Sequence, residues 1–175
     1  MHRIQQISRW MTIILTLAFL AMLLVGVTLI LFPDLSIQQI YSSYNLSPNI
    51  PPLTTWQYGA LALLAALNFL PTLFVIWKLR RMFQLFALGE VFSSAATGQL
   101  FGAAKGMVAW GIIAIFSTTA AVLILTANAA KGEHVLVANI STVQLAGIFA
   151  GVIFVVMSWV MQEAARLSEE NAGFV

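Results

Sequence analysis

The sequence predicts an all-α integral membrane protein, a bundle of four transmembrane helices that forms a single domain of 175 residues. Four stretches lack Asp, Glu, Lys, Arg and His, and each is about as long as the roughly 20 residues that a helix needs to cross a hydrocarbon core. They cover residues 11–32, 55–77, 107–127 and 142–161. The chain is also only 8% charged, against about 25% in an ordinary soluble domain.

The first apolar stretch follows Arg3 and Arg9, an arrangement that signal peptides share. Its 22 residues are longer than the apolar core of about 7–15 residues in a signal peptide. The stretch ends in Phe32-Pro33-Asp34-Leu35 instead of in small residues. We therefore interpret it as a retained first span.

The basic residues lie almost entirely on one side of the predicted membrane. Seven of the 8 Lys and Arg residues lie in the two terminal tails and in the loop 78–106, whereas the outer loops 33–54 and 128–141 hold only Lys131. The positive-inside rule then predicts that both termini and the loop 78–106 face the cytoplasm. We expect a multi-pass protein of the bacterial cytoplasmic (inner) membrane.

The outer loop 33–54 contains a helical pattern. Asp34 is a plausible N-cap, and Ile37, Ile40, Tyr41 and Tyr44 repeat at the spacing of one helical face. An amphipathic helix that lies on the outer membrane surface is the simpler interpretation. The alternative is a lid over an outward-facing cavity.

Asn68 is the polar side chain at the middle of the second span. A buried amide needs a hydrogen-bond partner, and the third span offers Ser117, Thr118 and Thr119 at a similar depth. We predict a hydrogen bond between Asn68 and this cluster, worth about 1 kcal/mol. The cluster is either an adhesive contact between helices or the polar wall of a ligand or ion pocket. Pro71, which follows Asn68 in the same span, predicts a kink.

The cytoplasmic loop 78–106 is expected to be largely helical. The second span continues past the membrane as an amphipathic helix, because apolar residues repeat there at helical spacing; they are Leu79, Met82, Phe83 and Phe86. Gly89 is expected to end this helix with a positive φ. Ser93 or Ser94 then caps the next helix, and Phe92 is expected to pack with Phe86 and Val91 around the turn.

Two further patterns concern the last span and its tail. Gly147 and Gly151 form a notch that favours close helix packing, either against span one, against span three or against a second copy of the chain. In the tail, Glu163, Arg166 and Glu170 are spaced for ion pairs on a helix that continues out of the membrane.

Two segments together resemble a known family. They are the basic-aromatic run that ends in Gly89-Glu90-Val91-Phe92 and the acidic segment 163–171. Both are similar to the domain-of-unknown-function family 2975, the YoaS-like four-span bacterial membrane proteins. The resemblance implies the four-span fold and, by association only, a helix-turn-helix regulator as a partner. The near-neutral stretch 93–99 departs from the family, whose members usually carry further basic residues there.

The composition argues against several functions. The chain has no cysteine and no cluster of acid, base and nucleophile, so we expect no enzyme, no catalytic residues, no cofactor and no metal. A formal charge of +2 is too small to indicate direct binding of nucleic acid. Membrane lipids are the partners that the composition itself implies.

Two hypotheses for function follow. The first is a regulatory or scaffold membrane protein that binds a protein partner at its cytoplasmic face, with a helix-turn-helix regulator as one candidate. The residues expected to bind are Arg80, Arg81, Phe86, Glu90, Phe92, Glu163, Arg166 and Glu170. The alternative is a small transporter, channel or lipophile-binding protein with a cavity near Asn68, acting either as a single chain or as a homo-oligomer.

Overall fold

Four long helices make up the protein in a computed structural model that describes residues 2–32, 34, 37–38, 52–128 and 140–172. They are α1 (His2–Leu31), α3 (Thr55–Ala87), α4 (Ser94–Thr126) and α5 (Thr142–Ala172). The part of the chain that is described contains no strand. All four helices are long and apolar enough to cross a membrane, which confirms an all-helical multi-pass protein.

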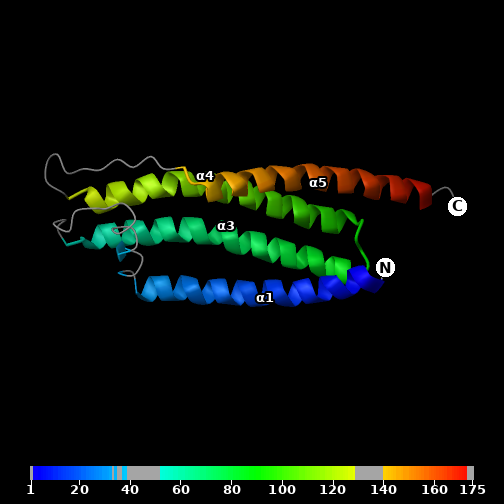
Figure 1. The fold of residues 1–175 in the computed structure, drawn as a ribbon, viewed down its shortest axis with the longest axis horizontal. Coiled ribbons are helices and arrows are strands. Elements are labelled where there is room, and N and C mark those ends of the chain that lie inside the picture. Colours follow the sequence, from blue (N-terminus) through cyan, green and yellow to red (C-terminus); the bar gives the residue numbers. More distant parts are fainter. Residues whose placement is uncertain (1, 33, 35–36, 39–51, 129–139, 173–175) are drawn as a thin grey trace.

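The helices run alternately up and down, so that both termini and the α3–α4 turn lie at one end of the molecule (Figure 1). Extensive contacts join α1 to α3, α3 to α4 and α4 to α5. Among the described residues, α1 and α5 have few or no direct contacts with one another. The expected bundle is therefore a row of neighbouring helices, with α1 at one edge and α5 at the other.

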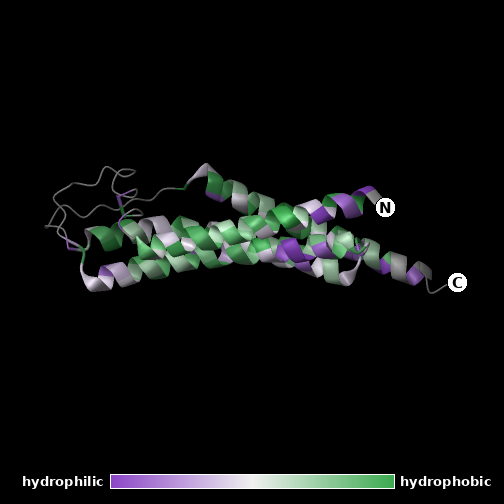
Figure 2. Ribbon diagram, turned by 90° about the horizontal axis from the view of Figure 1, so that it is seen from below, coloured by the Kyte–Doolittle hydropathy of each residue, from purple (hydrophilic) through white to green (hydrophobic). Residues whose placement is uncertain are grey.

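Hydrophobic residues cover the middle of the helices, and hydrophilic residues gather toward the N-terminus of α1 and the C-terminus of α5 (Figure 2). Large apolar side chains point outward along these surfaces; Leu17, Leu24, Phe116 and Phe149 are examples. Such a surface is stable in lipid and would be unfavourable in water.

The central position of α4 follows from its small residues. Gly106 lies against Val75 and Phe74 of α3, and Gly111 lies against Ile148 of α5. Without a side chain at these positions, the helices on either side approach the α4 backbone closely. Ala103 and Ala104 are fully buried between them.

The glycine notch of α5 packs within the same chain. A Cβ on Gly151 would lie 3.0 Å from the carbonyl oxygen of Ala104, and one on Gly147 would lie 2.8 Å from the ring of Trp110. Of the three partners that the sequence left open, the structure therefore selects the third span, which is α4.

At the turn between α3 and α4, the end of α3 and the cap of α4 form as the sequence predicts. The N–H of Leu88 closes α3 through the carbonyls of Gln84 and Leu85, and Gly89 adopts a φ of 93°. Ser93 is the N-cap of α4, where its hydroxyl accepts a hydrogen bond of 3.1 Å from the N–H of Ala96. At Pro71, α3 continues as helix on both sides of the proline.

Candidate functional site

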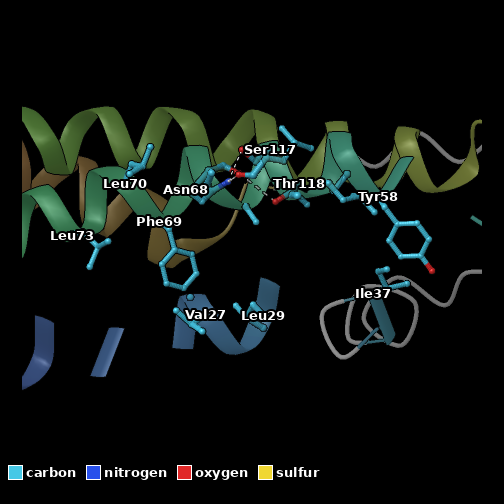
Figure 3. Close-up of a pocket in the computed structure, with 18 of the residues that line it drawn as sticks. Val27, Leu29, Ile37, Tyr58, Asn68, Phe69, Leu70, Leu73, Ser117 and Thr118 are labelled. Carbon is cyan, nitrogen blue, oxygen red and sulfur yellow. Dashed lines mark hydrogen bonds between the residues drawn. The ribbon is translucent and has the colours of Figure 1, made fainter. Parts of the chain in front are cut away.

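A cavity of about 580 Å³ lies between α1, α3 and α4, in the half of the protein farther from the termini. Its wall is mostly aliphatic and aromatic (Figure 3). Gln144, from the beginning of α5, also lines it. No Asp, Glu, Lys, Arg or His is among the described residues that line it, so this part of the wall suits neutral and apolar molecules.

The polar part of the wall is the cluster around Asn68. The Asn68 Nδ2 donates one hydrogen bond of 2.8 Å to Ser117 Oγ and another of 2.9 Å to the carbonyl of Leu64. The first of these bonds confirms the predicted link between the second and third spans. Thr118 also lines the cavity and donates to the carbonyl of Ala114 within α4. Thr119 is not among the lining residues.

One acceptor in this cluster is available to a ligand. Both amide hydrogens of Asn68 are accounted for by the two bonds from Nδ2. Its carbonyl oxygen Oδ1 accepts no hydrogen bond from the residues that the structure describes, and Asn68 is among the residues that line the cavity. A molecule with an O–H or N–H group could therefore bind at Oδ1.

The approach of α1 to α3 depends on Gly26. A Cβ at Gly26 would lie 3.3 Å from the ring of Phe69, which points from α3 toward α1 (Figure 3). Val27 and Leu29 flank this contact on the α1 side. The wall of the cavity on this side therefore consists of side chains that also hold α1 in place.

Ile37 and Tyr58 line the cavity toward the loop 33–54 (Figure 3). Ile37 is only 8% exposed, and it is helical together with Asp34 and Gln38. The remaining members of the predicted outer helix, Ile40, Tyr41 and Tyr44, lie outside the described residues.

Arg80 and Arg81, the two basic residues of the predicted partner-binding surface, have different neighbours. Arg80 Nε donates a hydrogen bond of 2.8 Å to Thr16 Oγ1 and so joins α3 to α1. Arg81 lies over the ring of Trp77, with its guanidinium carbon 5.3 Å from the ring centre. Arg80 therefore contributes to helix packing, and of the two only Arg81 is exposed.

At the α3–α4 turn, apolar side chains are presented to the exterior. Phe86 packs edge-on against Phe83 at 5.9 Å, but Phe92 is 60% exposed. The expectation that Phe92 packs with Phe86 and Val91 is therefore wrong: the turn places its ring on the outside. Glu90 is exposed beside it and forms no ion pair among the described residues.

The tail forms the predicted ion pairs on the exposed end of α5. Arg166 contacts Glu163 at 2.7 Å and Glu170 at 3.6 Å. All three side chains are more than half exposed, and such pairs typically contribute less than about 1 kcal/mol. No hydrogen bond or ion pair connects this triad to the α3–α4 turn in the part of the chain that is described.

A second polar contact, around Gln57, is absent from the sequence-based expectations. Gln57 is 1% exposed, and its Nε2 donates a bond of 2.7 Å to the carbonyl of Ile124 on α4. Its Oε1 accepts bonds from Thr54 and from Asn128. The sequence contained a signal for this contact, because the amides of Gln57 and Asn128 lie near the ends of two neighbouring spans. The contact joins the beginning of α3 to the end of α4.

Among the described residues, no group of three or more His, Asp or Glu side chains could hold a metal ion.

Comparison with known families identifies the chain. The model of a family described as "Protein of unknown function (DUF2975)" matches residues 8–173. The chain belongs to this family. The DUF2975 match includes α1 from residue 8 onward and the whole of α3, the α3–α4 turn, α4 and α5, which agrees with the resemblance of the two sequence motifs. Neither a curated protein nor a solved structure matches it significantly.

Proposed function

We propose that this chain binds one neutral, lipid-soluble molecule in the cavity beside Asn68. The observation that carries the proposal is the cavity itself, about 580 Å³ in volume and bounded by three helices. Small-molecule sites typically measure about 300–1,000 Å³ and combine apolar walls with a few placed polar groups. Of the hypotheses drawn from the sequence, a lipophile-binding protein agrees best with this geometry.

The chemistry of the wall restricts the ligand. The lining residues that the structure describes carry no charge, and an ion beside them would lose its hydration without a partner. The polar group that could bind a ligand is the acceptor Oδ1 of Asn68. The proposed ligand is therefore mainly hydrocarbon and carries one hydroxyl or amide donor, as a long-chain alcohol does.

The experiment compares two probes on purified full-length protein in lipid nanodiscs. Tritiated dodecanol carries the proposed donor, whereas tritiated dodecane lacks it. We expect Ala121→Phe, on the α4 wall, to abolish saturable binding of both probes because the ring fills the cavity. Asn68→Leu should weaken dodecanol binding about fivefold, the value of one hydrogen bond, and leave dodecane binding unchanged.

Leu123→Phe is the matched control, because Leu123 lies on the same helix, is exposed and does not line the cavity. It should bind both probes like the unmodified chain. Unaltered binding to Ala121→Phe would overturn the proposal, and so would an equal loss in Leu123→Phe.

The membrane and orientation are part of the proposal. We propose the bacterial inner membrane with both termini in the cytoplasm. Support comes from the distribution of basic residues, seven against one, together with the position of both termini at one end of the molecule (Figure 1).

A second candidate function is the binding of a protein partner at the end where the termini lie, in a regulatory or scaffold role. Leu88 is 74% and Phe92 60% exposed in the α3–α4 turn. Leu88 lies about 16 Å beyond Trp77 along the helix axis, and Trp77 is the type of residue that marks the membrane interface. Apolar side chains held this far outside the hydrocarbon favour a protein contact.

A two-hybrid assay in bacteria tests this candidate, with helix-turn-helix regulators from the same genome as the second protein. Leu88→Ser with Phe92→Ser should reduce the signal to background. Leu167→Ser removes an exposed apolar side chain from the tail and should preserve the signal. An interaction that survives the double change would exclude the turn as the contact.

A further inference from the structure

A groove between α3 and α4 lies at the other end of the membrane-spanning part, toward the termini. It has a volume of about 1,000 Å³ and extends along α3 from Leu67 to Lys78, with Phe19 of α1 at its edge. The α4 side is formed by residues between Gly98 and Ile113. The groove shares Leu70 and Leu73 with the cavity beside Asn68 but extends from them toward the termini, whereas the cavity extends the other way, toward Tyr58 and Gln144.

Two lysines lie at the mouth of this groove. The ammonium of Lys78 lies 5.4 Å from the ring centre of Phe74 and 5.1 Å from that of Trp77. The ammonium of Lys105 lies 4.5 Å from the ring centre of Phe101. Lys78 is half-buried and Lys105 is exposed. The attraction between each ammonium and its ring favours a position beside the groove for both charges.

The two lysines are directed to the same place by α4. A Cβ on Gly102 would lie 3.1 Å from the Cδ and Cε atoms of Lys78, so the lysine stem crosses from α3 over the α4 backbone. Gly102 and Lys105 are three residues apart and therefore share a helix face. Neither lysine forms an ion pair with a carboxylate in the described part of the chain, and no acidic residue lines the groove.

We propose that this groove binds one anionic phospholipid from the leaflet at the end where the termini lie. The phosphate is held between Lys78 and Lys105, and an acyl chain lies along the aromatic and aliphatic wall. From Lys78 to Leu67 the groove follows about 16 Å of helix, close to the half-thickness of about 15 Å for a hydrocarbon core.

The combination of charge and depth selects this occupant. Trp77 marks the interface, and both lysines lie at its level, whereas the rest of the groove descends into the apolar part of the protein. A free phosphate would bind only the two lysines and would leave the apolar part of the groove unoccupied. An acidic peptide would have to place polar backbone groups in the apolar part of the groove, which is unfavourable. A phospholipid satisfies both parts.

Native mass spectrometry of the full-length protein tests this site, with equal amounts of dioleoyl-phosphatidylglycerol and dioleoyl-phosphatidylcholine as probes. The unmodified chain should retain the anionic lipid about tenfold over the zwitterionic lipid. Lys78→Gln with Lys105→Gln should reduce the ratio to near one, because each lysine near a phosphate contributes severalfold. Lys78→Arg with Lys105→Arg should preserve it.

Arg3→Gln with Arg9→Gln is the matched control, since it removes the same charge from exposed residues at the same end. Its ratio should equal that of the unmodified chain. Equal losses in the control, no preference in the unmodified chain, or displacement of the lipid by millimolar inorganic phosphate would each overturn the proposal. Thermal unfolding in phosphatidylcholine establishes that each variant is folded.

Discussion

Asn68 serves both the fold and the proposed binding site through opposite ends of one amide. Its Nδ2 connects α3 to Ser117 on α4, and its Oδ1 accepts no hydrogen bond from the described residues. An unpaired amide in an apolar environment is unfavourable. The bond to Ser117 therefore reduces the cost of burying a group whose other end is open to a ligand.

The stability contribution of this contact is measurable. Asn68→Leu should lower the free energy of unfolding by about 1 kcal/mol, as determined by denaturation in mixed micelles. Ser117→Ala should cost a similar amount. Because the two side chains act as one contact, the double variant should be little worse than either single variant. Strictly additive losses would contradict the contact.

The sequence predicted this contact because two polar groups at the same depth in neighbouring spans must pair. It did not predict the bond from Arg80 to Thr16, because the relative register of α1 and α3 is set by packing and not by depth alone. The sequence predicts a cytoplasmic position for Arg80 from the positive-inside rule. A long basic side chain can extend away from its own backbone, and that of Arg80 extends to Thr16 on α1.

At the scale of elements, α4 holds the protein together through positions without large side chains. Gly106 admits α3, whereas Gly111 admits α5. The notch at Gly147 and Gly151 indicated tight packing from the sequence. Its partner could not be predicted, because three surfaces offered the same apolar chemistry and only the fold distinguishes them.

A pair of glycine substitutions tests this packing. Gly151→Ala should destabilise the protein by about 1–3 kcal/mol, because its Cβ would lie 3.0 Å from backbone atoms of α4 that cannot rotate away. Gly59→Ala has nothing within 4 Å of its Cβ and should stabilise slightly through its helix propensity. Denaturation in micelles measures both. Similar effects at the two positions would argue against the close α4–α5 contact.

At the scale of the whole molecule, the row of helices explains the location of the cavity. Because α1 packs mainly against α3, a space lined by all three helices remains between α1 and the α3–α4 pair. The four spans could be predicted from the absence of charge. A cavity near Asn68 was one of two alternatives that the sequence left open. Its volume could not be predicted, because it depends on how closely Gly26 and Phe69 bring α1 to α3.

The orientation of the molecule can be tested directly, since the chain contains no cysteine. Ile140→Cys and Leu88→Cys each introduce one exposed thiol, at opposite ends of the molecule. In intact spheroplasts, an impermeant maleimide should label Ile140→Cys and should reach Leu88→Cys only after permeabilisation. The reverse pattern would place the termini outside.

The most direct test of the central claim, that an apolar molecule occupies the cavity beside Asn68, is photolabelling with a dodecanol that carries a diazirine. Mass spectrometry should locate the adducts on lining segments of α3 and α4, with labelling suppressed by excess dodecanol and absent in Ala121→Phe. Adducts spread over the outward faces of all four helices, and unaffected by competitor, would contradict the claim.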